Sequence, residues 1–490
     1  MVINAVTGEP IARAVVELSA QSPQHIMTDA NGSFRFENVT EGAVTLTSDR
    51  PGFFDEISGR GAPPVLVQVS ADVDGVTLKL VPQAVIAGRI SSIQGVPIED
   101  FPVRLYRRNM MDGRVQWLLV GQAISDEDGQ FRMAGLMPGS YCISAGPENW
   151  RPRASGTKQL GYPHVFYPNV SDFSAASSIS LSAGQQAEAD FSLNQEPLFE
   201  VSGQIAGIPA TADVTVQLTN QPGEPVPLMQ PHPERHEFSG HVTAGWYTLR
   251  ASAQVEGQLL QATVPLNIAS NAAGIQVVVG PQVSIPVNVR SESADANPSR
   301  AQDIANASVR LVSTANSLSP SDFWARRIAA NPPTMGIIGM EPGTYSVEVN
   351  SNSSSYVQSA ISGSTDLLRD DLVVPSSGRV APIEVVLRDD GGGVSGRVQI
   401  ADHEGGATVL LVPERGSTKE IKTAAAQGTG EFQFEHVRPG DYSLLAFDRV
   451  DDLEYRNPEV LSSYLSSAAH VSVPPKQHVK ANLELIQLGK

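Results

Sequence analysis

Cysteine, aromatic residues and positive charge are all scarce in this chain of 490 residues. The single cysteine, Cys142, excludes an intrachain disulfide and a metal site built from several cysteines. Lys and Arg number 34 against 52 Asp and Glu, which gives a net charge of −18. That balance argues against a nucleic-acid partner, because phosphate backbones bind cationic surfaces. No apolar run approaches the roughly 20 residues of a membrane-spanning helix, so we expect no membrane insertion.

Glycine and proline are plentiful by contrast, and they mark an internal repeat. An Asp-x-x-Gly turn leads into a pair of aromatic or apolar residues, and a Pro-Gly-x-Tyr element follows. The glycine of this last element recurs about every 100 residues, which is the size of a small domain. Its five copies are Gly42, Gly139, Gly245, Gly343 and Gly440.

Each copy also contains two stretches in which every second residue is apolar. The upstream stretches include Val16 and Leu18 in the first copy and Val409 and Leu411 in the fifth. Period-two alternation puts such side chains on one face of a β-strand. Several short strands per copy, with turns and no convincing helical periodicity, predict an all-β chain of about five β-sandwich domains. The predicted boundaries are 1–81, 82–196, 197–280, 281–389 and 390–490.

The first copy resembles the carboxypeptidase regulatory-like domain. The resemblance rests on Thr7-Gly8-Glu9-Pro10-Ile11, the alternation that follows, and Asp29-x-x-Gly32-x-Phe34. The second and fifth copies match as well, whereas the third and fourth are degenerate. The resemblance implies a tandem array of Greek-key, transthyretin-like sandwiches, similar to collagen-adhesin B-type repeats and to starch-binding-like folds. It further implies domains without catalytic activity, of the kind found in secreted or envelope-associated bacterial proteins.

The start of the chain falls inside the predicted first strand. Aligning Pro10 with Pro97 places Met1 on Gly88, so the residues that precede Gly88 in the second copy have no counterpart. The first domain is therefore expected to be N-terminally truncated, with its export signal missing from this chain. A cytoplasmic protein and an artificial boundary remain the alternatives.

An aromatic-rich insertion in the second copy is the candidate carbohydrate site. Its rings are Trp150, Tyr162, Phe166 and Tyr167. Exposed aromatic faces bind sugar rings, but such rings can equally seal the edge of a sandwich. In the fifth copy the corresponding place has Asn457 before Pro458, which predicts a short helix capped by the asparagine.

Four further patterns are interpreted structurally. The Asp29 and Asp126 turns lack the remaining ligands of a calcium loop. His232 and His236 are separated by Pro233, which breaks the helix that a zinc-binding pair would need. The glycines at 391, 393 and 396 lead into a strand, so we interpret them as a domain linker and not as a dinucleotide loop. Cys142 is expected on the face opposite Tyr141, partly covered.

The sequence thus predicts a non-enzyme with no cofactor and no metal. The expected role is an extracellular, periplasmic or cell-surface scaffold, a monomeric rod whose partner is an unknown surface protein or polysaccharide. A carbohydrate-binding array and the soluble extension of an outer-membrane transporter are the alternatives.

Overall fold

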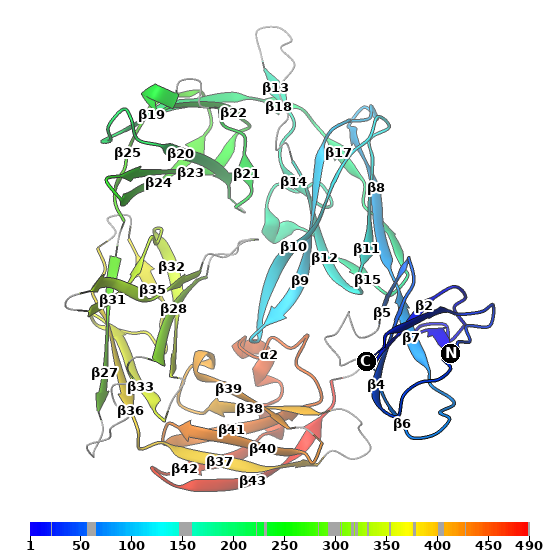
Figure 1. Cartoon of the computed structure of the whole chain (residues 1–490). Helices are drawn as coiled ribbons and strands as arrows, with labels where there is room; N and C mark the ends of the chain where they lie inside the picture. The colour runs from blue at the N-terminus through cyan, green and yellow to red at the C-terminus, as the bar shows by residue number, and fades with distance from the viewer. Residues whose placement is uncertain are drawn as a thin grey trace. The chain divides into compact units, whose positions relative to one another are not determined.

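The computed structural model describes most of the chain (Figure 1). The residues outside the description are 21, 56–64, 147–158, 222, 230–232, 283, 293–303, 305, 315–317, 319–321, 331–332, 352–353, 376–378, 400–405, 427 and 489–490. The remainder divides into two compact units, residues 1–108 with 119–198, and residues 109–118 with 199–490. Each unit is described by itself.

The fold is all-β, as the sequence predicts, and one topology occurs five times. Successive runs of strands form sandwich 1 (β1–β7), sandwich 2 (β8–β17), sandwich 3 (β19–β26), sandwich 4 (β27–β36) and sandwich 5 (β37–β43). Each run surrounds a cluster of buried apolar side chains of its own. The exact domain boundaries stay a prediction.

The first sheet of every sandwich pairs its first strand with its last, in parallel. The first strands are β1 (Val2–Asn4), β8 (Ala84–Ser92), β19 (Phe199–Ala206), β27 (Ser284–Glu292) and β37 (Gly392–Gln399). The last strands are β7 (Leu78–Pro82), β16 (Gln186–Glu188) with β17 (Phe191–Leu193), β25 (Ala272–Val278), β36 (Ile383–Arg388) and β43 (His478–Ile486). All five pairs are parallel. Figure 1 shows β37 and β43 side by side.

In the same sheet, the first strand also pairs on its other side with the aromatic or apolar stretch of the repeat. The strands that form it are β11 (Gln130–Leu136), β22 (Glu237–Val242), β31 (Pro333–Ile338) and β40 (Glu431–Val437). In sandwich 1 the stretch around Phe34 and Phe36 forms no strand, unlike its counterparts in the other four sandwiches. β1 has only three residues, and its hydrogen bond to this side runs from Val2 N to Gly32 O. Both rings nevertheless pack against the apolar cluster.

The second sheet pairs the second strand with the Pro-Gly-x-Tyr strand. The second strands are β2 (Val15–Ser19), β9 (Pro102–Met111), β20 (Val214–Asn220), β28 (Ala307–Ser313) and β38 (Ala407–Pro413). Their partners are β4 (Gly42–Asp49), β12 (Gly139–Ala145), β23 (Gly245–Val255), β32 (Gly343–Ser351) and β41 (Gly440–Phe447). Consecutive strands thus cross between sheets, which is the Greek-key arrangement.

Two more strands extend each second sheet. Beside the second strand lie β3 (Gln24–Met27), β10 (Arg114–Ile124), β21 (Pro225–Val226), β29 (Asp322–Trp324) and β39 (Lys422–Ala426). Beside the Pro-Gly-x-Tyr strand lie β6 (Val65–Val69), β15 (Ile179–Leu181), β24 (Gln258–Ile268), β35 (Leu372–Val374) and β42 (Ala469–Val473).

The remaining elements are short and differ between the sandwiches. The strands are β5 (Phe53–Asp55), β13 (Leu160–Gly161), β14 (Val165–Phe166), β18 (Glu196–Pro197), β26 (Gly280–Pro281), β30 (Arg326–Ala330), β33 (Tyr356–Ser362) and β34 (Thr365–Asp366). The helical turns are η1 (Phe173–Ala175), η2 (Pro233–Arg235), η3 (Thr418–Glu420) and η4 (Leu465–Ser467). One α-helix is described, α2 (Pro458–Ser462).

Helix α2 confirms the sequence prediction. The side chain of Asn457 accepts a hydrogen bond from the backbone N–H of Glu459 at 3.1 Å, and Pro458 occupies the first turn. The helix buries Leu461, which joins a small cluster on the outer face of sandwich 5 with Phe447 and Tyr455.

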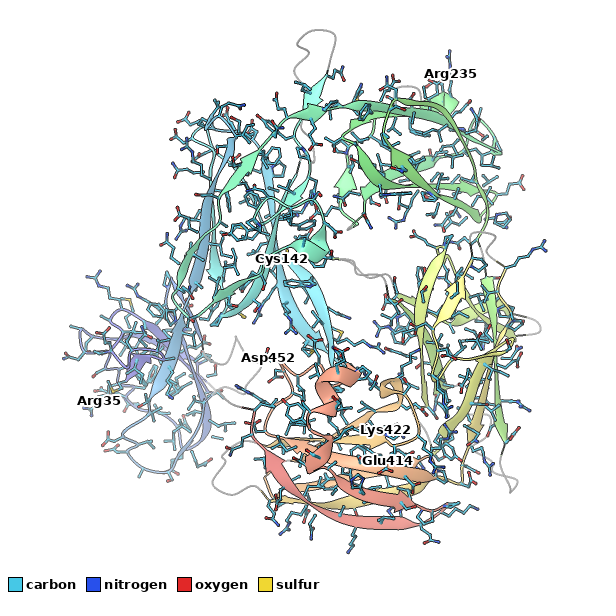
Figure 2. The ribbon with its side chains drawn as sticks, turned by 180° about the vertical axis from the view of Figure 1, so that it is seen from behind. Arg35, Cys142, Arg235, Glu414, Lys422 and Asp452 are labelled. Carbon is cyan, nitrogen blue, oxygen red and sulfur yellow. The ribbon has the colours of Figure 1, made fainter. Side chains whose placement is uncertain are left out.

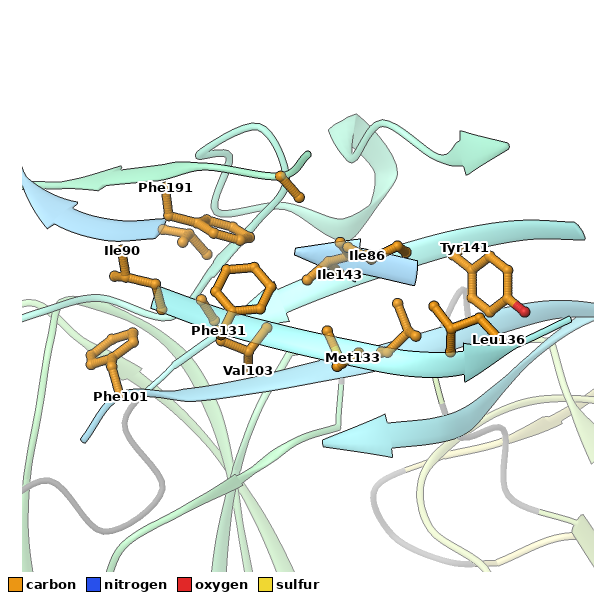
Figure 3. Close-up of a cluster of buried hydrophobic side chains, with 14 of the residues drawn as sticks. Ile86, Ile90, Phe101, Val103, Phe131, Met133, Leu136, Tyr141, Ile143 and Phe191 are labelled. Atoms are coloured by element: carbon orange, nitrogen blue, oxygen red, sulfur yellow. The ribbon is translucent and has the colours of Figure 1, made fainter. Parts of the chain in front are cut away.

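Sandwich 2 shows how the repeat residues build a core (Figure 3). Phe131 from β11 and Phe191 from β17 lie with their ring centroids 6.3 Å apart, and Phe101 is fully buried beside β9. Burial of each such ring contributes roughly 1.5–3 kcal/mol to folding. The Phe and Tyr positions of the motif therefore do occupy the core, as their alternation predicts.

The tyrosines of the Pro-Gly-x-Tyr element also make a hydrogen bond. Each hydroxyl donates to the carbonyl oxygen four residues upstream, over 2.6 to 3.0 Å. The pairs are Tyr141 to Met137, Tyr247 to Thr243, Tyr345 to Glu341, and Tyr442 to Arg438. The bond ties the turn to the strand that follows it, which explains why tyrosine and not phenylalanine stands in four copies.

Candidate binding surfaces

The aromatic insertion of sandwich 2 lies largely inside the sandwich. Phe166 is fully buried, and its ring packs at a tilt against Phe173 with centroids 5.4 Å apart. Tyr162 and Tyr167 are half-buried and meet the core rings Phe101 and Phe191 edge-on, at 5.9 and 6.1 Å.

These contacts bear on the candidate carbohydrate site. Phe166 has no ring face open to a sugar, and the two tyrosines pack against the core of sandwich 2. Trp150, the fourth candidate, lies outside the described residues. A sugar site at this insertion stays a prediction, whereas the packing role of the three other rings is observed.

Cys142 is more deeply covered than expected. The side chain is 2% exposed, and it lies opposite Tyr106, itself buried, in the ladder between β12 and β9 (Figure 2). The prediction of a partly covered residue is wrong because the outer face of this sheet has large neighbours that the repeat pattern does not reveal.

The two aspartate turns have the chemistry expected of turns. The Oδ1 atom of Asp29 accepts from the backbone N–H groups of Asn31 and Ser33, both at 2.8 Å. Asp126 accepts in the same way from Asp128 and Gln130. One oxygen of each carboxylate, Oδ1, is thus bonded to its own turn.

The predicted glycine linker and His236 also have structural roles. Gly393 and Gly396 lie in strand β37, so the linker interpretation is wrong and the glycines belong to the parallel pair with β43. His236 is 7% exposed, and its Nε2 atom lies 3.1 Å from the carbonyl oxygen of Ala212. His232 is outside the described residues.

One grouping that sequence reasoning missed lies on sandwich 5. Three side chains meet there: Glu414 directly after β38, Ser443 of β41 and His470 of β42. Figure 2 labels Glu414. The Oε1 atom of Glu414 and the Oγ atom of Ser443 both approach the same ring atom, Nδ1 of His470, at 2.6 and 3.3 Å. A hydrolytic relay needs the carboxylate and the serine on opposite ring nitrogens. This arrangement therefore fits a surface hydrogen-bond cluster.

A cleft of about 1070 Å³ in the second unit is lined by sandwiches 3 and 4. Arg250 of β23 crosses it, and its Nε and Nη2 atoms bond the two carboxylate oxygens of Glu341. The bond to Glu341 raises the pKa of Arg250 and outweighs the opposing effect of burial. The polar side chains in the rest of the lining are nearly all hydroxyls and amides, which sequence patterns alone do not distinguish from an ordinary solvated sheet face.

A smaller cavity of about 190 Å³ lies where residues of sandwiches 4 and 5 meet Asp112. Tyr455 donates its hydroxyl to Oδ1 of Asp112 at 2.9 Å, and Arg456 pairs with Oδ2 at 2.6 Å. Burial and the nearby negative charge of Asp112 raise the pKa of Tyr455, so this hydroxyl stays protonated and keeps donating at neutral pH. Asp112 and Arg456, which line this cavity, are thus held in a structural network.

Two general properties complete the description. No group of three His, Cys, Asp or Glu side chains that could hold a metal ion occurs among the described residues. No helix in that part of the chain is long and apolar enough to cross a membrane.

Comparison with known proteins finds a family match for the N-terminal part of the chain. Residues 1–77, which include nearly all of sandwich 1, match the family model of the carboxypeptidase regulatory-like domain. Sandwich 1 thus has the predicted family. Sandwiches 2 to 5 share the strand order of sandwich 1, but the match does not reach them. Among curated proteins, none matches the chain.

Three solved structures illustrate what this chain is similar to. The Bacillus anthracis TIE protein is 13% identical, with a TM-score of 0.19, over 57% of this chain and 50% of its own. The major pilin subunit BcpA of Bacillus cereus is 10% identical, with a TM-score of 0.14, over 82% and 99%. The RrgB pilus protein of Streptococcus pneumoniae is 8% identical, with a TM-score of 0.15, over 83% and 98%. This chain thus spans half the length of the first of them, and such low scores carry no inference about function.

Proposed function

We propose that this protein is a non-catalytic scaffold of the cell envelope or extracellular space, in which regulatory-like sandwiches act as spacers between partners. The proposal rests mainly on one observation, the parallel pairing of the first and last strand in all five sandwiches.

Parallel pairing determines where the chain enters and leaves a sandwich. Two antiparallel end strands would return the chain to the side from which it came. Two parallel end strands release it at the opposite end of the sheet. Each sandwich therefore carries the chain forward by about 3.3 Å per strand residue, which is the property that a spacer requires.

The same pairing resists tension. A pull on the two ends of a sandwich slides its first strand along its last, so the interstrand hydrogen bonds are loaded together and not one after another. Sandwich 5 has seven residue pairs in this ladder, from Gly393 with His478 to Gln399 with Glu484. Sandwich 1 has three, from Val2 with Leu78 to Asn4 with Leu80.

The family match supports the non-catalytic part of the proposal. Residues 1–77 match a domain that, by the resemblance described above, has no catalytic activity of its own. The extended monomeric rod and the identity of the partner stay predictions.

The location and the scaffold role can be tested together in the native host. Intact cells are treated with a membrane-impermeant amine reagent, and labelled peptides are identified by mass spectrometry. We expect the exposed Lys79 and Lys480 to be labelled before lysis, and a cross-linked pull-down from the envelope to recover a specific partner. Labelling only after lysis contradicts the location, and a pull-down without a specific partner contradicts the scaffold role.

A further inference from the structure

The outer face of the second sheet in sandwich 3 has an unusual composition. Strands β20, β23 and β24 lie side by side there, with Gln217 opposite Arg250 and Arg250 opposite Thr263. The neighbouring row joins Thr215, Ser252 and Gln261. We name the six residues Thr215, Gln217, Thr248, Ser252, Gln261 and Thr263 the amide–hydroxyl face, and all six line the cleft of about 1070 Å³.

This face is nearly free of charge in a strongly acidic chain. Its one charged neighbour in these rows, Arg250, is neutralised by its two bonds to Glu341. The equivalent strands of sandwich 4 place Arg310 opposite Glu348. The uncharged character therefore belongs to sandwich 3 and is not a property of the repeat.

The face also keeps its hydrogen-bonding capacity available. Within the described part of the chain, Gln217, Ser252 and Thr263 have no side-chain hydrogen-bond partner, while Gln261 accepts from Gln282 at 2.8 Å. Hydroxyl and amide groups both donate and accept, so this array can match a ligand that does the same.

An exposed tryptophan continues the array. Trp246 stands two residues before Thr248 on β23, and therefore points to the same side of the sheet, opposite Asn267 of β24. Trp246 is 58% exposed to solvent. The other four copies have Ala43, Ser140, Thr344 and Asp441 at this position.

The chemistry selects one class of occupant. A nucleic acid needs cations that the face lacks, and a protein partner usually needs an apolar centre. Sugar units instead combine hydroxyl groups with an apolar ring face that stacks on tryptophan.

We propose that the amide–hydroxyl face, together with Trp246, binds a neutral polysaccharide, lying along β23 and β24. Each of these strands has 11 residues, so the face is long enough for a chain of several sugar units and not only for a single one. The segment from Gly339 to Tyr345 lines the same cleft, and its Glu341 bonds Arg250, which lies between Gln217 and Thr263. This site is separate from the aromatic insertion of sandwich 2, and it does not depend on the spacer role.

Affinity gel electrophoresis of the full chain tests the proposal. The probes are soluble starch, dextran, mixed-linkage β-glucan and galactomannan, with anionic alginate as the charged comparison. We expect at least one neutral polymer to retard the protein and alginate not to do so. Failure of all four neutral polymers, or retardation by alginate alone, overturns the proposal.

Substitutions then place the site. Trp246→Ala and Gln217→Ala are each expected to weaken the apparent affinity by about fivefold or more, as the loss of one stacking or hydrogen-bond contact does. Trp324→Ala, which removes the 51% exposed tryptophan of sandwich 4, is the matched control and should leave the affinity unchanged. Equal retardation of wild type and Trp246→Ala overturns the placement on this face. Circular dichroism of each variant confirms that the sandwiches remain folded.

Discussion

Glycines in the first strands hold the parallel pairs together. A Cβ atom at Gly203 or Gly396 would lie 2.1 or 1.7 Å from a carbonyl oxygen of the last strand. At Gly88 it would lie 2.1 Å from the carbonyl oxygen of Ala189, between β16 and β17. Real Cβ atoms do not approach so closely, so only glycine lets the two strands come together here. The sequence displays these glycines, but their purpose depends on a strand about 80 residues further along the chain.

We expect Gly396→Ala to lower the free energy of unfolding of sandwich 5 by about 1–3 kcal/mol, since the added methyl group overlaps the carbonyl of Ala481. Hydrogen exchange of β37 and β43 peptides, followed by mass spectrometry, measures the change. Gly440→Ala in the same sandwich is the control, because its nearest atom would be 3.8 Å away. Equal protection in both variants would contradict the packing argument.

Asp390 follows the last strand of sandwich 4 and binds two of its residues. Tyr356 donates its hydroxyl to Asp390 at 2.9 Å, and Arg388 pairs with it at 2.6 Å. Burial alone would raise the pKa of this carboxyl, but the hydrogen bonds from Tyr356 and Arg388 outweigh it and hold the pKa below its usual value. The folded state therefore favours the carboxylate.

A depressed pKa makes this contribution depend on pH in a definite direction. The stabilisation is complete above the ordinary carboxyl pKa of about 3.9 and is lost as the pH falls through the lower folded value. We expect Asp390→Asn to lower the free energy of unfolding of sandwich 4 by about 1–2 kcal/mol at pH 7, with the difference shrinking below about pH 4. Calorimetry of both proteins at pH 7 and pH 3 measures it. A difference that grows toward low pH would refute the assignment.

At the scale of elements, the short helix α2 depends on two side chains, Asn457 and Leu461. It has only five residues, too few to be stable alone, so its cap and the burial of Leu461 must hold it. Because the cap is local in sequence, Asn457 and Pro458 were sufficient to predict the helix.

Asn457→Ala should accelerate amide exchange in residues 457–463 by about fivefold, which corresponds to the loss of about 1 kcal/mol of capping. Asn457→Ser retains an oxygen that can accept from Glu459 and should exchange at the wild-type rate. If both variants exchange alike, the cap does not stabilise the helix.

Ladder length makes a second prediction at this scale. In single-molecule stretching of the full chain, the seven-pair ladder of sandwich 5 should rupture at a higher force than the three-pair ladder of sandwich 1. Gly396→Ala should lower the highest-force event without altering the weakest. An unchanged force spectrum would contradict the claim that the parallel strand pairs resist tension.

At the scale of the whole molecule, the second unit includes a short segment that sequence order assigns elsewhere. Residues 109–118 join β9 to β10, yet they belong to the same compact unit as residues 199–490. Gly113, with φ of +69°, lies so close to the Tyr455 ring that a Cβ atom would be 2.6 Å from it. Arg456 bonds the carbonyl oxygen of Asp112 at 2.8 Å as well as its carboxylate.

Asp112→Ala removes the acceptor for both Tyr455 and Arg456. Arg114 also belongs to this segment, where it pairs with Glu348. We expect trypsin to cleave after Arg114 several-fold faster in this variant, because the segment loses its bonds to Tyr455 and Arg456 and opens more often. Time-resolved limited proteolysis with mass spectrometry measures the rate. Asp74→Ala, at an exposed aspartate of sandwich 1, should leave cleavage at Arg114 unchanged. Equal rates in all three proteins would show that the segment is not held by Asp112.

The sequence alone determined what depends on local spacing. Alternation predicted the strands, the Asp-x-x-Gly and Pro-Gly elements predicted the turns, and the period of about 100 residues predicted five sandwiches. Tertiary structure decided what depends on residues far apart: the parallel closure of each sandwich, the burial of Phe166 and Cys142, and the strand at Gly393. It also decided which polar strand face lines a cleft, because the outward residues of a strand look alike in sequence until a neighbouring domain or ion pair, such as Arg250 with Glu341, encloses them.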